Sequence, residues 1–176
     1  MAEKGKQVFR VVINGSQEAI WRELTSTDRP LGAIFNSRMY TTGLKPGARM
    51  QMRTASGGHV IVEGDILEYS PPHRFVHTHK FTMHDDPVCR VTYELKPVPG
   101  GVEVTLTVDD VPLGTRTAKG MASGGHDIVN NLKAIVETGR PPLGQRIVHS
   151  LMGALEFVLP AKTKADRFPL EDKETA

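Results

Sequence analysis

Apolar and polar residues alternate along most of the chain between residues 8 and 108, which is typical of strands with one buried face. In residues 49–54 the alternation places Met50 and Met52 inward and the intervening polar side chains outward. Strands are expected over residues 8–13, 39–42, 49–54, 62–69, 74–81, 89–96 and 102–108. Successive short strands at this spacing predict a curved antiparallel sheet.

Residues 63–81 contain two strand patterns separated by a Ser-Pro-Pro-His turn. Proline fixes φ and has no N–H to donate, so Pro71 and Pro72 suit a tight turn and would disrupt a strand. A hairpin is therefore predicted, with Tyr69 facing Arg74 across the turn. This register places Glu63 opposite Lys80 on one face of the sheet.

The other face of the same hairpin carries two histidines. The predicted register pairs residues 62, 64 and 66 with residues 81, 79 and 77, so His77 and His79 point toward the interior. They lie there beside Phe75 and Phe81. A shift of one residue would exchange the two faces.

Helical periodicity appears early in the chain and again after the last strand. Ser16 is a good N-cap for a helix over residues 17–26, and residues 31–35 are expected to form a short second turn of helix. A long helix is predicted from about Thr117 to Gly139, although Gly124 and Gly125 each cost about 1 kcal/mol relative to alanine.

A last amphipathic helix is predicted over residues 143–160, where Pro160 ends it, and a charged, loosely held tail follows. The order of elements is then strand, one or two helices, six strands, long helix and extra helix. We predict an α+β fold in which the long helix packs across a curved antiparallel sheet and encloses a cavity. Residues 1–141 form the domain, residues 142–160 the extra helix and residues 161–176 the polar tail.

Composition narrows the functional classes. The chain of 176 residues has 22 basic and 20 acidic residues, a net charge of +2, so there is no electrostatic case for nucleic-acid binding. A single cysteine, Cys89, excludes an intrachain disulfide and suits a reducing compartment. The N-terminal residues are polar and the last helix is too short to span a bilayer. We therefore expect a cytoplasmic protein that does not bind membranes.

Three segments resemble one known family. The hairpin GDILEYSPPHRFVHTHKF resembles the G-x-V-L-E-x-x-P-P-x-R-L-V-x-T-W signature of the SRPBCC superfamily. Its nearest branch is named after the C-terminal domain of the activator of the Hsp90 ATPase. The segment EAIWRELTSTDRPLGAIF is similar to that branch's first helix, and GGHDIVNNLKAIVETG is similar to its closing helix. The three motifs cover roughly residues 8 to 139.

The resemblance implies a helix-grip fold, shared with START lipid-transfer domains and birch-pollen-type allergens, with a hydrophobic cavity between the long helix and the sheet. It does not imply a single function, because the fold hosts carriers, cyclases and co-chaperones. The chain departs from the pattern where the family usually has aromatic residues, with His79 in the hairpin and His126 in the closing helix. We expect these two histidines to form one polar site across the cavity.

The two hairpin histidines are compatible with three roles. With His59, His84 or Glu68 they could hold a metal ion, but the sequence guarantees only two of the three or four ligands that zinc needs. They could instead bind a polar group of a ligand, or be hydrogen-bonded core residues. Acid–base catalysis by the two histidines with Tyr93 and Glu68 is a further alternative, although no nucleophile–base pattern accompanies them.

The function predicted from the sequence is the binding of a small, mostly hydrophobic molecule, without a cofactor. A co-chaperone-like protein-interaction module and a cyclase-like or lyase-like enzyme are the alternatives. The last helix has an apolar face too wide to leave in water, so it caps the cavity, packs on the outer face of the sheet or pairs with a second subunit; we favour a homodimer. The candidate cavity residues are Met50, Met52, Ile66, His77, His79, Phe81, Tyr93, Met121 and His126.

Overall fold

The computed structural model describes residues 3–171 and contains seven strands and three α-helices in the predicted order. The strands are β1 (Lys4–Ile13), β2 (Arg38–Thr41), β3 (Arg49–Arg53), β4 (Val60–Ser70), β5 (Arg74–Phe81), β6 (Cys89–Val98) and β7 (Gly101–Pro112). The helices are α1 (Gln17–Thr25), α2 (Arg116–Thr138) and α3 (Leu143–Ala154), followed by the 3₁₀ turns η1 (Glu156–Val158), η2 (Ala161–Thr163) and η3 (Ala165–Arg167).

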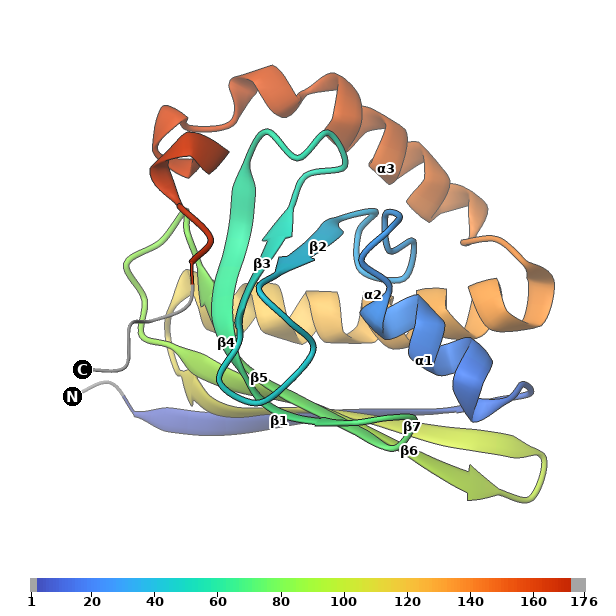
Figure 1. Ribbon diagram of the computed structural model, residues 1–176. Helices are drawn as coiled ribbons and strands as arrows, with labels where there is room; N and C mark the ends of the chain where they lie inside the picture. The colour runs from blue at the N-terminus through green and yellow to red at the C-terminus, as the bar shows by residue number, and fades with distance from the viewer. Residues whose placement is uncertain (1–2, 172–176) are drawn as a thin grey trace.

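The strands form one antiparallel sheet in the order β1-β7-β6-β5-β4-β3-β2. In Figure 1, β1, β7 and β6 lie along the bottom of the molecule while β4, β3 and β2 rise toward α3, so the sheet curls around α2. The alternation in the sequence is the physical basis of this shape, because one apolar face per strand is buried against a single long helix. The predicted α+β helix-grip architecture is confirmed.

The β4–β5 hairpin has the predicted register in its outer part only. Glu63 pairs with Lys80 and Ile66 pairs with His77 as expected. Leu67 is then a β-bulge, and Tyr69 pairs with Phe75 instead of Arg74. The extra residue turns Tyr69 from the outer face of the sheet to the inner face.

That reversal gives Tyr69 a place in the core. Its ring lies 5.4 Å from the ring of Trp21 in α1 and 5.8 Å from that of Phe75, measured between centroids. The indole N–H of Trp21 donates to the Tyr69 hydroxyl over 3.3 Å. The bulge thus joins the hairpin to α1, which is itself capped by the Ser16 side chain as predicted.

Helix α2 packs across the concave face of the sheet and ends at Gly139, whose φ of +80° is the left-handed conformation that glycine tolerates. Gly124 and Gly125 do not interrupt it. Gly125 is required by packing, because a Cβ there would come within 2.2 Å of the Phe9 ring of β1. The entropic cost of this glycine is offset by the close approach of helix and sheet that it permits.

Two local expectations are wrong. Residues 31–35 are not helical but form a turn closed by a bridge between Leu31 and Ser37, with Phe35 and Asn36 at positive φ. The last helix is shorter than predicted, because α3 ends at Ala154 and the chain continues as 3₁₀ turns.

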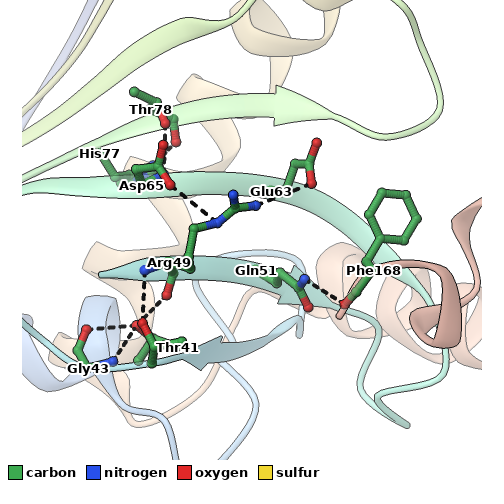
Figure 2. Close-up of polar contacts among 10 residues, drawn as sticks. Thr41, Gly43, Arg49, Gln51, Glu63, Asp65, His77, Thr78 and Phe168 are labelled. Carbon is green, nitrogen blue, oxygen red and sulfur yellow. Dashed lines mark hydrogen bonds and ion pairs between the residues drawn. The ribbon is translucent and has the colours of Figure 1, made fainter. Parts of the chain in front are cut away.

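The tail predicted to be loose is held on the sheet as far as residue 168. Thr163 is fully buried, and its hydroxyl lies 2.8 Å from Nδ1 of His59. Gln51 of β3 donates to the carbonyl of Phe168 over 3.0 Å, which buries a side chain that the alternation correctly assigned to the outer face (Figure 2). The last five residues of the predicted tail, 172–176, lie outside the described residues.

The same outer face carries an ion-pair cluster centred on Arg49. Its guanidinium lies 3.3 Å from the carboxylate of Asp65 and 3.7 Å from that of Glu63, both on β4 (Figure 2). Charge therefore gathers on one face of the sheet, whereas the opposite, concave face carries mainly apolar side chains. Within residues 3–171, no helix is long and apolar enough to cross a membrane.

Candidate ligand-binding cavity

A cavity of about 470 Å³ lies between the concave face of the sheet, α2 and α3. Cavities of this size accept drug-sized organic molecules. The sheet contributes mainly apolar side chains: Met39, Met50, Met52, Phe75, Phe81, Val91, Leu106 and Val108. Helix α2 contributes Gly120, Met121, Gly124, Gly125 and Ile128, so three of its five wall residues have no side chain and leave room.

The polar side chains of the wall fall into two groups. Tyr93 and the two histidines of β5 lie in the sheet, whereas the others lie around the segments that approach α3: Asn36, Ser37, Arg53, Thr54, His149 and Glu156. Arg53 is the only lysine or arginine among the described wall residues. Its guanidinium lies 4.3 Å above the Tyr40 ring, and its Nε donates to Gln51.

His77 is almost fully enclosed, with 5% of its surface exposed, and its Nδ1 lies 2.8 Å from the backbone carbonyl oxygen of Thr78. Burial lowers the pKa of His77 to about 4, because desolvation disfavours the charged ring more than the Thr78 carbonyl favours it. The ring is therefore neutral at pH 7.

His79 lies two residues further along β5, with its ring centroid 6.0 Å from that of His77. Its Nε2 is buried and has no hydrogen-bond partner within residues 3–171. Burial, and to a smaller extent the charge of a protonated His77, lower the pKa of His79 to about 3. Both histidines thus present neutral imidazoles to the cavity.

Tyr93 of β6 lies beside them, with its ring 6.4 Å from that of His77 and nearly parallel to it. Burial raises the pKa of the Tyr93 hydroxyl, which keeps it protonated. Phe75 and Phe81 flank the histidines, with ring centroids 5.2 Å from His77 and 4.7 Å from His79. The result is a row of aromatic rings along β5 with three neutral polar groups in it.

Helix α3 covers the cavity from the side opposite the sheet. Figure 1 shows it crossing above β2 and β3, and Val148, Leu151 and Met152 contribute to the wall. None of its residues is buried, so it rests on the cavity without being packed into the core. Of the three placements considered for the last helix, capping the cavity is the one observed.

One carboxylate, that of Glu156 in η1, holds the segment that follows α3 against the sheet. Oε1 of Glu156 accepts hydrogen bonds from the Thr54 hydroxyl over 2.6 Å and from the Ser56 hydroxyl over 2.5 Å. We call this set of bonds the Glu156 latch. It joins η1 to the turn between β3 and β4, 100 residues earlier in the chain.

Seven of the nine candidate residues line the cavity: Met50, Met52, His77, His79, Phe81, Tyr93 and Met121. Ile66 does not. It is fully buried within the sheet, where it pairs with His77. His126 does not line it either, because its side chain is exposed and its ring packs edge-on against Phe9, 4.8 Å between centroids. The expected site joining His79 to His126 is therefore wrong.

Several wall residues had no signal in the sequence. His149 and Glu156 belong to the segment beyond the predicted domain, and only the folded structure shows where that segment lies. Nε2 of His149 is buried without a partner among residues 3–171, and burial lowers its pKa. Glu68 is directed elsewhere, since it pairs with Arg74 over 3.0 Å.

The residues considered as metal ligands do not come together. His59 contacts Thr163, and Glu68 pairs with Arg74. Within the described part of the chain, no group of three or more His, Cys, Asp or Glu side chains is placed to hold a metal ion.

Comparison with known proteins identifies the architecture. The model of the family described as Activator of Hsp90 ATPase homolog 1-like protein matches residues 6–137. The match ends within α2, so α3 and the 3₁₀ turns lie outside it. No curated protein sequence matches the chain.

Solved structures share the fold at low sequence identity. Protein MLL2253 from Mesorhizobium loti is 22% identical, with a TM-score of 0.63 over 76% of this chain and 97% of that one. The Aha1 dimer from Colwellia psychrerythraea is 19% identical, with a TM-score of 0.62 over 77% and 98%. CalU16 from Micromonospora echinospora is 15% identical, with a TM-score of 0.59 over 87% and 92%. Such identities show the fold alone.

Proposed function

The chain belongs to the family of Activator of Hsp90 ATPase homolog 1-like proteins, and we propose that it binds a small, mostly hydrophobic molecule in the cavity beneath α3. The observation that carries the proposal is the cavity of about 470 Å³ between the sheet, α2 and α3, whose wall is apolar except for two groups of polar side chains. This combination is typical of small-molecule sites. A protein-interaction module of the co-chaperone type needs no such space in its core.

The protonation states favour binding over acid–base chemistry. Efficient general bases titrate near the working pH, whereas burial holds the pKa of His77 at about 4 and that of His79 at about 3. Neutral imidazoles and a protonated Tyr93 can form hydrogen bonds to a ligand without carrying charge into the apolar wall. The methionines Met50, Met52 and Met121 add flexible, polarizable contacts.

A neutral fluorescent probe tests the proposal directly. We expect N-phenyl-1-naphthylamine to bind the protein with increased fluorescence. A Gly124→Leu variant places a side chain in the wall and should weaken binding at least tenfold. Gly144→Leu is the matched control, because Gly144 lies on α3 outside the wall with open space around it.

Two outcomes would reject ligand binding in this cavity. One is an unchanged probe affinity in Gly124→Leu. The other is the absence of both probe binding and any small molecule retained in native mass spectrometry of protein purified from its own host. Circular dichroism of both glycine variants shows whether they remain folded, so that a loss of binding can be distinguished from unfolding.

A second candidate role is self-association through the outer face of α3 and η1. Ile147 and Phe157 expose 55% and 81% of their surface, and Leu143 exposes 69%. Exposed apolar side chains gathered on one element favour burial against a partner. The fold relative from Colwellia psychrerythraea is described as a dimer. A second copy of this chain is the proposed partner.

Sedimentation velocity tests the dimer. We expect the wild-type mass to be twice 19.3 kDa at micromolar concentration and an Ile147→Lys, Phe157→Ser variant to sediment as a monomer. Val12→Lys, which alters an exposed apolar residue of β1, is the control. A monomeric wild type, or a dimer that persists in the double variant, would exclude this interface.

A further inference from the structure

The tautomer of His77 follows from its geometry. Nδ1 lies 2.8 Å from the carbonyl oxygen of Thr78, and a carbonyl oxygen can only accept. Nδ1 therefore carries the proton, and in the neutral ring Nε2 is left with a lone pair. His77 is fixed as a hydrogen-bond acceptor by its own backbone.

That acceptor belongs to the cavity. His77 lines the wall, and its Nε2 forms no hydrogen bond within residues 3–171. Unlike Nε2 of His79, it is not sealed off by protein atoms. The hydroxyl of Tyr93, which lines the same wall, has no hydrogen bond within the described residues either. A ligand that satisfies His77 must bring a donor.

The surroundings disfavour an anion at this point. His77 pairs with Ile66 on β4, whereas Arg53, the wall's only lysine or arginine among residues 3–171, pairs with Val60. Six residues of β4 separate the two pairing positions, a path of about 20 Å along the strand at 3.3 Å per residue. A carboxylate beside His77 would be buried next to a lone pair and without a counter-charge.

The walls around His77 fit a flat ring system. The ring centroid of Phe75 lies 5.2 Å from that of His77. The ring centroid of Tyr93 lies 6.4 Å from that of His77, and these two rings are nearly parallel. The site therefore presents aromatic faces and edges. Aromatic ligands stack against such rings at centroid distances of about 4.5–7 Å. Methionines at positions 50 and 52 can adapt to the outline of the ligand.

We propose that the cavity selects a neutral, hydroxylated aromatic molecule whose hydroxyl group donates a hydrogen bond to Nε2 of His77. This inference rests on the proposed ligand-binding function and specifies its ligand class. A hydrocarbon of the same shape leaves Nε2 without a donor, and an aromatic carboxylate brings an unpaired charge. The ligand keeps its proton, because burial lowers the pKa of His77 to about 4 and a phenol titrates near 10.

Three probes of nearly equal shape separate the possibilities: 2-naphthol, 2-methoxynaphthalene and 2-naphthoate. By calorimetry, wild-type protein should bind 2-naphthol about tenfold more tightly than 2-methoxynaphthalene, the gain of one net hydrogen bond. The carboxylate should bind most weakly. His77→Phe should bind 2-naphthol and 2-methoxynaphthalene equally, and Gly144→Leu, on α3 outside the wall, should keep the wild-type preference.

A measurement on unmodified protein covers the case in which His77→Phe fails to fold. In ¹⁵N-labelled protein, the imidazole of His77 should show a protonated Nδ1 and an unprotonated Nε2. The Nε2 signal should shift with 2-naphthol and stay in place with 2-methoxynaphthalene. A protonated Nε2, or identical shifts with both probes, would overturn the assignment.

The binding results also separate this inference from the function on which it rests. Equal affinities of wild-type protein for 2-naphthol and 2-methoxynaphthalene, or a preference for the carboxylate, would reject the hydroxyl class and leave apolar binding intact. Failure of all three probes while N-phenyl-1-naphthylamine binds would also reject the class. Failure of N-phenyl-1-naphthylamine together with all three would reject the proposed function itself.

Discussion

Gly125 of α2 lies directly against the ring of Phe9 in β1, so close that a Cβ at position 125 would stand 2.2 Å from Cε2 of that ring. The neighbouring Gly124 has a different environment, because a Cβ there would meet Phe35 at an ordinary 3.5 Å. Two adjacent glycines in one helix therefore have different reasons to be glycine. Both line the cavity wall, but only Gly125 is required for the close approach of the helix to Phe9.

We expect alanine to have opposite effects at these two positions. Gly125→Ala should destabilise the fold by about 1–3 kcal/mol, because the ring of Phe9 must move or the helix must lift from the sheet. Gly124→Ala should stabilise it by up to about 1 kcal/mol through helix propensity. Urea denaturation of the two variants measures both changes. Equal effects at the two positions would show that Phe9 does not limit the approach of α2.

The sequence predicted the secondary structure where one periodicity dominates. Alternation located the strands, and the change of period near Thr117 located α2. It could not predict the bulge at Leu67, because the alternation of apolar and polar residues continues on both sides of an inserted residue. The preference of Tyr69 for the Trp21 side of the sheet is a tertiary contact, which local pattern does not encode.

The candidate site was predicted less completely for a geometric reason. Residues on one strand face share an orientation, so the placement of His77 and His79 followed from register. On a helix each residue is rotated by about 100° from the last, so a residue next to the buried stripe faces elsewhere. His126 follows Gly125, which contacts the sheet, and it turns outward to the edge of Phe9.

The prediction for the C-terminal segment was wrong because it relied on composition. Its charged composition indicated a loose tail, but three specific hydrogen bonds hold it to β3 and to the strand edge at His59. Such contacts depend on single atoms, among them the carbonyl of Phe168 and the hydroxyl of Thr163. Composition carries no information about them.

The Glu156 latch should control access to the cavity more than it controls global stability. Glu156→Ala removes the acceptor shared by Thr54 and Ser56, and α3 has no buried residue to hold it in place otherwise. We expect amide hydrogen exchange in α3 to accelerate about tenfold, while the unfolding midpoint of the domain changes little. Release of a bound probe should accelerate with it.

Two further variants serve as controls for the latch. Glu171→Ala alters an exposed carboxylate near the end of the described chain and should leave exchange in α3 unchanged. Thr54→Val combined with Glu156→Ala should add less than the sum of the single effects, because both remove the same hydrogen bond. Fully additive effects on exchange would mean that the two side chains do not act together.

Thr163 should anchor the C-terminal segment. Its hydroxyl donates to the carbonyl of Pro160 over 2.8 Å and accepts from Nδ1 of His59 at the same distance. Thr163→Val keeps the shape but leaves Nδ1 of His59 without this partner, and the Pro160 carbonyl keeps only its bond from the Thr163 N–H, so the variant should lose about 1 kcal/mol. Limited proteolysis should then cleave between residues 159 and 171 earlier than in wild-type protein. Ser150→Ala on the exposed side of α3 should not change the cleavage rate, and an unchanged rate in Thr163→Val would contradict the anchoring role.

The two cavity histidines should make the protein less stable in mild acid. Folding holds the pKa of His77 at about 4, below its ordinary value of 6.5, so between these values the unfolded chain binds more protons than the folded one. Stability therefore rises with pH through this window and levels off above about pH 7. His79, with a pKa of about 3, acts in the same direction. Cys89 and Tyr93 do not contribute, because burial raises the pKa of both and they stay protonated throughout.

Chemical denaturation at pH 5 and pH 7 measures this dependence. For His77 the difference in unfolding free energy should reach up to about 2 kcal/mol, since one pKa unit corresponds to about 1.4 kcal/mol. The slope between the two pH values is the informative quantity, because His77→Phe can change absolute stability for reasons of packing alone. That variant should lose part of the slope, and the double variant with His79→Phe should lose most of it. A slope as steep in the double variant as in wild-type protein would mean that other groups govern the acid response and that the two rings are accessible to protons in the folded state.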